Sequence, residues 1–219
     1  MYKISELYDL NYTICGNYLE KFVYPWEALS GLNKYVQTLG MSLNKDDYKE
    51  ILPHVWVHKT AFVSPTAFLG SECIICENAE IRHNAFLRGN AVVGKNAVVG
   101  NSTELKNSIL FDNVQVPHYN YVGDSILGYK THLGAGAVTS NVKSDKSCIT
   151  IRNANAVYET NLKKCGAMLG DYVEVGCNSV LNPGTIVGKH STIYPLSCVR
   201  GVVPSNSIYK AKAEIVQKK

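Results

Sequence analysis

Two basic residues and one histidine are the side chains whose types and spacing could do chemistry together. Arg88 and Lys106 lie eighteen residues apart, and His118 follows a proline in the segment VPHYNYVGDS, residues 116–125. Two neighbouring cations can share one phosphate through charge-assisted hydrogen bonds. A histidine can accept a proton near neutral pH, which suits it as a general base for an attacking amine. Glu104 lies two residues before Lys106 and would share its face of a strand.

Each of these residues also has a simpler interpretation. Most lysines and arginines are solvated surface charges, and a lone histidine usually only hydrogen-bonds its own loop. Which interpretation applies depends on the elements that position the residues.

A six-residue repeat predicts those elements. Every sixth residue from Val57 to Phe111 is apolar, and a small residue follows four positions after each of the first eight: Ala61, Ala67, Cys73, Ala79, Ala85, Ala91, Ala97 and Thr103. Neither a helix of period 3.6 nor a strand of period 2 keeps this phase. A sandwich would instead need turn signals about every 8–12 residues. The pattern resembles the left-handed parallel β-helix of hexapeptide-repeat proteins, an all-β fold with three six-residue sides per coil.

The repeat predicts where the coils are interrupted. The apolar phase returns at Leu127 and Leu133 and again from Leu169 to Val199. Phe111 and Leu127 are sixteen residues apart, which we interpret as two repeats plus four extra residues, in a loop near residues 112–121 that contains His118. Residues 141–165 place polar side chains at inward positions, which predicts a second loop or a hairpin.

The ends of the chain predict helical segments around a central solenoid. Residues 1–54 are expected to form a helical cap, with an amphipathic helix over Pro25–Gly40 that covers the open first coil. Residues 55–203 are expected to form the β-helix, and residues 204–219 a tail that includes a short helix.

The coil length turns the spacing of the basic residues into geometry. Positions eighteen apart stack on one face, and adjacent coils are about 4.8 Å apart. Arg88 and Lys106 should therefore project side by side from one wall, close enough to hold one phosphate.

Composition argues against several classes of protein. The formal net charge of +4 is spread along the chain without a basic run, which argues against a nucleic-acid partner. No stretch reaches the ~20 apolar residues of a membrane span, and the N-terminus lacks a signal-peptide pattern, so we expect a cytoplasmic protein. Seven cysteines, an odd number, predict reduced thiols, and the lone Cys73-x-x-Cys76 pair is better interpreted as packed thiols than as a metal site.

Four segments resemble one known family. They are VGNSTELKNS (99–108), PHYNYVGDSILG (117–128), LGAGAVTSN (133–141) and LKKCGAMLGDYVEVGCNSVLNPG (162–184). They are similar to the acetyltransferase half of the bifunctional UDP-N-acetylglucosamine pyrophosphorylase/glucosamine-1-phosphate N-acetyltransferase family, and the last segment resembles its archaeal members. The resemblance covers residues 55–203. It implies an N-acetyltransferase that uses acetyl-CoA, needs no metal for acetyl transfer and forms a homotrimer with sites between subunits.

The resemblance also implies roles for individual residues. His118 would be the general base and Glu104 would orient it. The phosphorylated amino sugar would be held by Arg88, Lys106, Tyr121, His132, Asn141 and Lys146. Acetyl-CoA would lie along Ala135, Cys177 and Pro195, with backbone N–H groups around Ala135 stabilising the oxyanion.

The sequence departs from the family at several points. His132 stands where bacterial members have an asparagine, and Val142 replaces a tyrosine, so the acceptor sugar is left open. Nothing in residues 1–54 resembles the glycine-rich nucleotide loop of the pyrophosphorylase half, so we do not expect this chain alone to make nucleotide sugars.

Two other function classes compete with the acetyltransferase. One is a trimer that binds a nucleotide sugar or sugar phosphate without catalysis and partners a separate nucleotidyltransferase. The other is the metal-dependent carbonic anhydrases built on the same solenoid, but the six histidines lack the close H-x-x-x-x-H pair of such sites.

Overall fold

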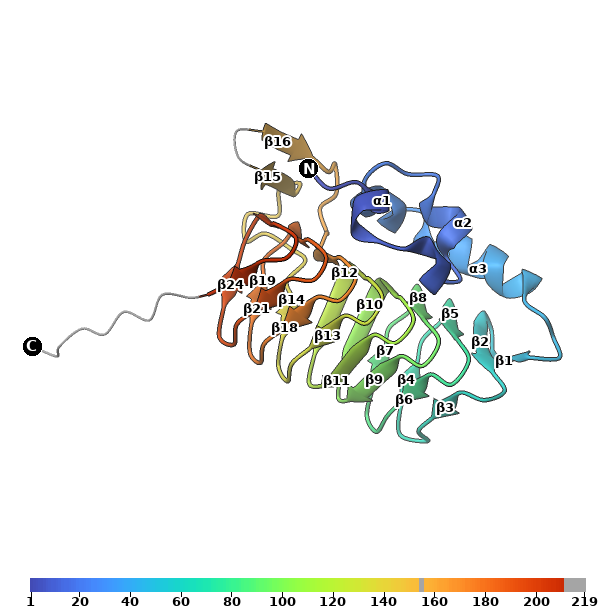
Figure 1. Cartoon of the computed structure of the whole chain (residues 1–219). Coiled ribbons are helices and arrows are strands. Elements are labelled where there is room, and N and C mark those ends of the chain that lie inside the picture. Colours follow the sequence, from blue (N-terminus) through green and yellow to red (C-terminus); the bar gives the residue numbers. More distant parts are fainter. Residues whose placement is uncertain (154–155, 211–219) are drawn as a thin grey trace, which may run out of the picture.

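The computed structural model describes residues 1–153 and 156–210. A left-handed parallel β-helix runs from Val55 to Tyr209, as the repeat predicts, and helices lie along one flank (Figure 1). Its three sides are named here the first, second and third side.

The strands of each side stack in parallel, one per coil. The first side holds β2 (Val55–His58), β5 (Cys73–Ile75), β8 (Ala91–Val93), the C-terminal parts of β10 (Glu104–Leu110) and β12 (Tyr121–Leu127), β17 (Ala167–Leu169), β20 (Thr185–Val187) and β23 (Val202–Val203). The second side holds β4 (Phe68–Leu69), β7 (Phe86–Leu87), the N-terminal parts of β10 and β12, β14 (Val138–Thr139), β19 (Val180–Leu181) and β22 (Cys198–Val199). The third side holds β3 (Phe62–Val63), β6 (Glu80–Ile81), β9 (Val98–Asn101), β11 (Gln115–His118), β13 (His132–Leu133), β18 (Glu174–Val175), β21 (Thr192–Ile193) and β24 (Ile208–Tyr209).

The corners explain why a six-residue side can close. Residues at the turns between sides adopt positive φ, and asparagine recurs there at Asn78, Asn84, Asn90 and Asn96. Asparagine tolerates this left-handed conformation better than most residues because its short side chain can bond locally. The predicted aliphatic residues fill the interior between these corners.

The prediction of a loop near residues 112–121 is wrong, because these residues continue the wall and include strand β11. Val99 pairs with Val116 and Leu105 with Val122, so these coils contain seventeen residues instead of eighteen. The sixteen residues between Phe111 and Leu127 are three sides that lack two residues. The corner at Asp124 comes five residues after the preceding one and removes one residue from this stretch. The corner at Asn107, also five residues after its predecessor, lies before Phe111 and moves the inward position from Phe111 to Leu110, which accounts for the second residue.

The shortened corner also shifts the inward phase by one residue. Leu110, not Phe111, pairs with Val93 and faces the interior. Phe111 is buried on the outside, where its ring lies 5.1 Å from that of Tyr8. His118 therefore ends strand β11 in a regular wall.

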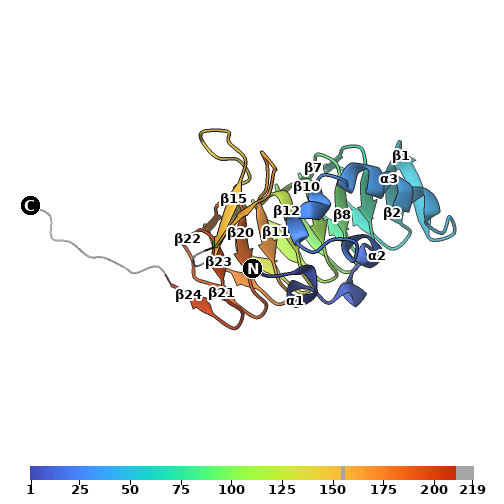
Figure 2. The same ribbon diagram turned by 90° about the horizontal axis from the view of Figure 1, so that it is seen from above.

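The N-terminal segment runs lengthwise along the first side and does not cover the open end of the first coil (Figure 2). The Tyr2 hydroxyl contacts Ser205 Oγ (2.9 Å) in the last coil, and Gln37 Nε2 donates to Glu72 Oε1 (3.0 Å) near the first. Its elements are α1 (Ile4–Leu7), the 3-10 helix η1 (Leu10–Tyr12), α2 (Gly16–Leu19), the 3-10 helix η2 (Pro25–Leu29) and α3 (Leu32–Ser42).

A column of outward aliphatic side chains explains this placement. Each lies one residue before an inward one, and all have no exposed surface: Ile74, Val92, Ile109, Ile126, Met168 and Ile186. A strand that is apolar on both faces must be covered on both. The N-terminal segment supplies the cover.

A hairpin covers the edge of the first coil. Strand β1 (Tyr48–Leu52) pairs antiparallel with β2. Gly40 of α3 meets Trp56 of β2 so closely that an added Cβ would overlap the indole ring. The second tryptophan, Trp26 of η2, is buried and stacks on Tyr24 with ring centroids 4.7 Å apart.

Residues 141–165 leave the wall at the corner between the second and first sides. They contain an antiparallel hairpin of β15 (Thr150–Asn153) and β16 (Ala156–Glu159), and the Cys165 N–H donates to the Asn141 carbonyl (3.0 Å) where the segment returns. We call this segment the excursion.

The C-terminal end of the solenoid lies beyond the predicted boundary at residue 203. Within the predicted tail, β24 pairs with β21, and residues 211–219, where a helix was expected, lie outside the described residues. No helix within the described parts of the chain is long and apolar enough to cross a membrane.

Candidate functional site

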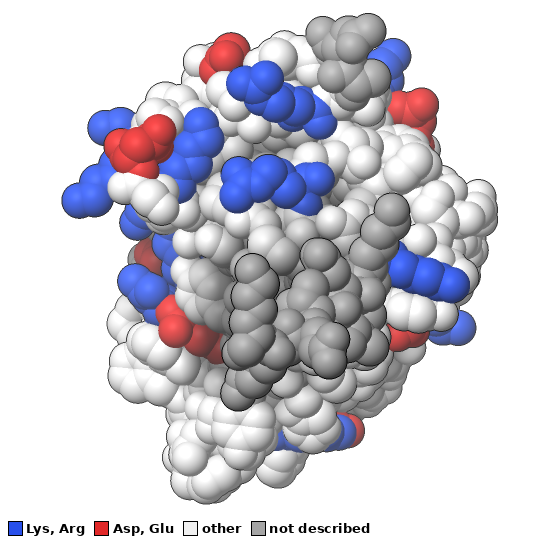
Figure 3. All heavy atoms as spheres, turned by 90° about the vertical axis from the view of Figure 1, so that its left-hand side faces the viewer, with Lys and Arg blue, Asp and Glu red and all other residues white. Residues whose placement is uncertain are grey.

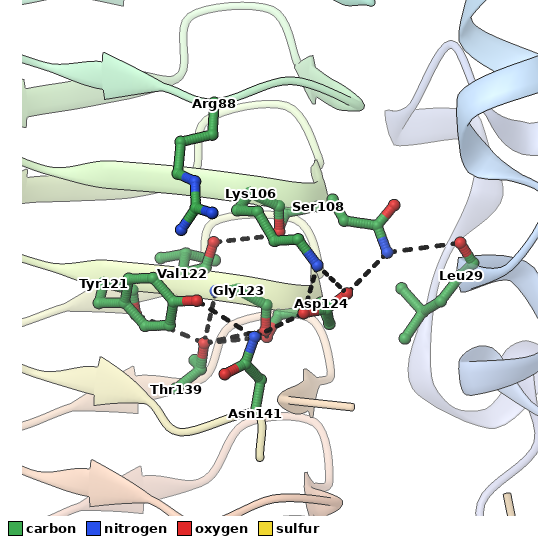
Figure 4. Close-up of polar contacts among 12 residues, drawn as sticks. Leu29, Arg88, Lys106, Ser108, Tyr121, Val122, Gly123, Asp124, Thr139 and Asn141 are labelled. Atoms are coloured by element: carbon green, nitrogen blue, oxygen red, sulfur yellow. Dashed lines mark hydrogen bonds and ion pairs between the residues drawn. The ribbon is translucent and has the colours of Figure 1, made fainter. Parts of the chain in front are cut away.

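Arg88 and Lys106 lie next to each other on the second side, as the coil length predicts. Leu87 pairs with Leu105, so the residues that follow them project outward from adjacent coils (Figure 4). The alignment holds because no residue is lost between these two positions.

Each of these cations already has a carboxylate partner. Arg88 Nη1 donates to Glu104 Oε1 (2.9 Å), and Lys106 Nζ donates to both oxygens of Asp124 (2.8 and 2.9 Å). The pair of Lys106 and Asp124 is the more buried one, with side-chain exposures of 22% and 4%. Glu104 is therefore held by Arg88. Within the described residues no hydrogen bond joins Glu104 to His118, which it was predicted to orient.

Asp124 connects Lys106 to the excursion. Its carboxylate also accepts from Asn107 Nδ2 (2.9 Å) and from the Asn141 side-chain amide. The same amide donates to the Tyr121 hydroxyl (3.1 Å). A tyrosine hydroxyl is protonated at neutral pH, and burial raises the pKa of Tyr121 further, so this hydroxyl can donate to an anion. The structure thus brings together four predicted sugar-binding residues: Arg88, Lys106, Tyr121 and Asn141.

His118 lies at the corner between the third and second sides. It pairs with Asn101 on one side, and the Gly136 N–H donates to its carbonyl (3.0 Å) on the other. Its side chain is exposed, and its ring makes no hydrogen bond within residues 1–153 and 156–210. The ring is free to meet a ligand.

The predicted acetyl-CoA residues continue this corner coil by coil. Ala135 follows His118 in register, then Cys177 and Pro195, because Leu133 pairs with Val175 and Val175 with Ile193. We call these four residues the corner column. The Ala135 N–H has no acceptor among the described residues, so it can donate to a ligand oxygen.

Two predicted sugar-binding residues lie elsewhere in the chain. His132 projects from the third side, where its Nδ1 lies 2.8 Å from Glu174 Oε2. Lys146 lies exposed in the excursion. A single chain does not bring His132 to the wall that carries Arg88 and Lys106.

Asp124 is the residue that sequence reasoning missed. Its signal is the dipeptide Gly123-Asp124 at a place where the repeat loses a residue, since aspartate tolerates the left-handed conformation of a tight corner. Interpreting the missing residues as an insertion hid this signal.

All seven cysteines are free thiols. Cys15, Cys73, Cys76 and Cys165 are buried, whereas Cys148, Cys177 and Cys198 are exposed. Cys73 and Cys76 are thus packed thiols, and burial raises the pKa of each to about 12.

Comparison with protein families decides the membership of the chain. Residues 71–213 match the family described as the GMPPB C-terminal domain. The chain belongs to the GMPPB C-terminal domain family. The matched residues of this family member include Arg88 and Lys106 on the second side and all four residues of the corner column.

Curated relatives agree with the resemblance predicted from the sequence motifs. The chain is 34% identical to the "Bifunctional protein GlmU" of Methanococcus vannielii over 115 residues, which are 52% of this chain and 28% of the relative. It is 28% identical to the "Bifunctional sugar-1-phosphate nucleotidylyltransferase/acetyltransferase" of Sulfurisphaera tokodaii over 106 residues, 48% of this chain and 26% of the relative. The match therefore spans about a quarter of each relative.

Solved structures with some likeness to this chain include an acetyltransferase domain. The acetyltransferase domain of PglB from Neisseria gonorrhoeae FA1090 in complex with acetyl coenzyme A is 15% identical, with a TM-score of 0.30 over 71% of this chain and 53% of that chain. PerB from Caulobacter crescentus in complex with CoA and GDP-perosamine is 17% identical, with a TM-score of 0.27 over 69% and 51%. At such TM-scores neither structure bears on the function of this chain.

Proposed function

We propose that this chain transfers an acetyl group from acetyl-CoA to the amine of an amino-sugar phosphate, with His118 as the general base. The observation that carries the proposal is the corner column, in which His118 lies in register with Ala135, Cys177 and Pro195. An extended pantetheine arm along this corner would bring its thioester to the histidine. The name of the Sulfurisphaera tokodaii relative, which combines a sugar-1-phosphate nucleotidylyltransferase with an acetyltransferase, supports the same reaction class.

The proposed reaction is a direct transfer. The sugar amine attacks the thioester carbonyl carbon, and His118 takes the proton that the nitrogen loses as the C–N bond forms. The Ala135 N–H, which lacks an acceptor among the described residues, would stabilise the oxyanion. The C–S bond then breaks, and the CoA thiolate leaves and takes up a proton.

The sugar phosphate would bind at the second side. Arg88 and Lys106 carry two positive charges, and Glu104 and Asp124 balance them. An incoming phosphate therefore has to compete with these carboxylates, most easily at the more exposed pair of Arg88 and Glu104. The protonated Tyr121 hydroxyl offers a further donor to the phosphate.

We also propose that the active unit is a homotrimer. His132 lies on the third side and Arg88 on the second, so only a neighbouring copy could bring the two predicted sugar-binding residues together. Closed rings with one repeated interface are a common way to build such shared sites.

The acetyl-transfer assay follows release of the CoA thiol with a panel of amino-sugar 1-phosphates and nucleotide-linked amino sugars. We expect turnover with at least one acceptor and a kcat about 10²–10⁴-fold lower in His118→Asn, the usual contribution of a general base. His190→Asn is the matched control, because His190 stacks on Tyr172 at a different corner of the solenoid. Full activity of His118→Asn would contradict the proposed base.

The binding role without catalysis is the second candidate. It is favoured by the placement of Glu104, which pairs with Arg88 and leaves His118 without an orienting carboxylate in the single chain. Binding of an amino-sugar phosphate without CoA release from any acceptor would support this role.

A further inference from the structure

A groove lies between the excursion and the last coils of the solenoid. It has a volume of about 510 Å³ and is lined by β15, by the turns around Pro183 and Gly201, and by Lys143 and Arg200. A second hollow of about 430 Å³ shares Lys143, Pro183 and Arg200 with the first. The two hollows together form one groove with room for a ligand much larger than a single phosphate.

Three cations line the larger hollow, and no carboxylate does. They are Lys143, Arg152 and Arg200. The end view in Figure 3 shows lysine and arginine side chains gathered over the upper part of this end of the molecule. A hollow that concentrates positive charge without neutralisation attracts anions.

Among the described lining residues, Asp145 of the smaller hollow is the one carboxylate against three cations, so positive charge is in excess. Arg200 Nη2 donates to Asn182 Oδ1 (3.3 Å), and Lys143 Nζ donates to the Cys148 carbonyl (2.8 Å), both neutral acceptors. None of the three forms an ion pair with a carboxylate in the described parts of the chain. Arg88 and Lys106, by contrast, are both paired, so the groove is the more strongly cationic of the two places.

The larger hollow lies apart from the proposed sugar-phosphate site, whereas Ser140 and Val142 of the smaller hollow flank Asn141 of that site. Arg200 and Lys106 occupy the same outward position on the second side but are four coils apart, through Val122, Thr139, Leu181 and Val199. At ~4.8 Å per coil this separates them by about 19 Å. One phosphate cannot contact both.

We propose that this groove binds a nucleoside diphosphate. Lys143, Arg152 and Arg200 hold the two phosphates, since arginine binds phosphate oxygens in a bidentate manner. Pro183 and Val202, on the wall of the hollow, offer apolar contact to the nucleoside. This site stands independently of the proposed acetyl transfer.

Calorimetric titration of the full chain with ADP, GDP, UDP and inorganic pyrophosphate tests the site without acetyl-CoA or acceptor. We expect at least one nucleotide to bind with a Kd tenfold or more below that of pyrophosphate. We expect the double variant Arg152→Gln/Arg200→Gln to bind that nucleotide at least tenfold more weakly. Arg152 and Arg200 are exposed, so the variant should fold, and an unchanged circular dichroism spectrum and Tm would verify this.

Arg88→Gln is the matched control, since it removes a guanidinium from the other site and should leave nucleotide binding unchanged. Equal affinity for pyrophosphate and nucleotides would overturn the nucleoside assignment. Absence of nucleotide binding at millimolar concentration, unchanged binding by the double variant, or an equal loss in Arg88→Gln would overturn the site itself. None of these outcomes depends on whether the chain transfers acetyl groups.

Discussion

Asp124 holds together residues from two other parts of the chain. It is 3% exposed and contacts Lys106 and Asn107 on the preceding coil and Asn141 at the start of the excursion. Removing one partner of a buried ion pair leaves the other charge uncompensated. The role of Asp124 is therefore to position Lys106 and Asn141.

Asp124→Asn should lower the free energy of unfolding by about 2 kcal/mol. This is less than the full ~3–5 kcal/mol for a buried pair, because water partly reaches Lys106. Glu104→Gln, which breaks the more exposed pair with Arg88, should cost less than about 1 kcal/mol. Urea unfolding of both variants measures the difference, and equal losses would contradict the special burial of Asp124.

The thiols should divide into two classes of reactivity. Burial raises the pKa of Cys73, Cys76 and Cys165 to about 12 in each case, and Cys15 is also fully buried. Because the thiolate is the reactive form, these four should resist iodoacetamide at pH 8. Mass spectrometry should find adducts on Cys148, Cys177 and Cys198 in the native protein and on all seven after unfolding. Modification of Cys73 in the native protein would contradict the packed interior.

Excess acetyl-CoA should slow the alkylation of Cys177, if its pantetheine arm lies along the corner column. Cys148 in the excursion and Cys198 on the second side are the internal controls, and their rates should stay unchanged. Equal rates for Cys177 with and without acetyl-CoA would contradict the proposed cofactor path.

Sequence reasoning placed Arg88 beside Lys106 but could not place Asp124. The first pair lies within an uninterrupted run of six-residue sides, where counting gives the position in space. A spacing of sixteen residues between two apolar positions, however, fits two six-residue sides with four residues inserted as well as three sides with two residues missing. Only the pairing of Leu105 with Val122 decides between them, and that pairing is a matter of backbone hydrogen bonds.

At the scale of elements, the first side differs from the other two because both of its faces are buried. Its strands carry adjacent apolar residues, as in CII (73–75), AVV (91–93) and TIV (185–187). This doubling was visible in the sequence and could have placed the N-terminal segment along this side. The six-residue repeat describes only the inward position, so it does not show this second apolar position.

Ile126→Ala should destabilise the protein by about 2–5 kcal/mol, because Ile126 lies fully buried under the N-terminal segment. Val180→Ala removes an outward aliphatic side chain of the second side that is 36% exposed, and should cost less than about 1 kcal/mol. Chemical unfolding measures both. Similar losses would show that the first side is not covered in solution.

At the scale of the whole molecule, a shared site can be tested by mixing two inactive variants. Arg88→Gln and His132→Ala should each lose most acetyl transfer, whereas randomly mixed trimers should recover about a quarter of the sites, since both intact residues then meet at some interfaces. Co-expression with two affinity tags provides the mixed trimers. Light scattering should give about three times the 24.1 kDa of one chain. A mass of one chain, or no recovery on mixing, would contradict the shared site.

The positions of the two tryptophans determine what a fluorescence experiment can detect. Trp26 and Trp56 are the only tryptophans in the chain, and both are buried where the N-terminal segment meets the wall. The tryptophan emission of this protein therefore reports the undocking of that segment and does not detect unfolding of the last coils. Stacked repeats contact only their neighbours, so distant coils can melt separately. A fluorescence transition that precedes the loss of far-ultraviolet circular dichroism would show that the solenoid stays folded after the N-terminal segment has undocked.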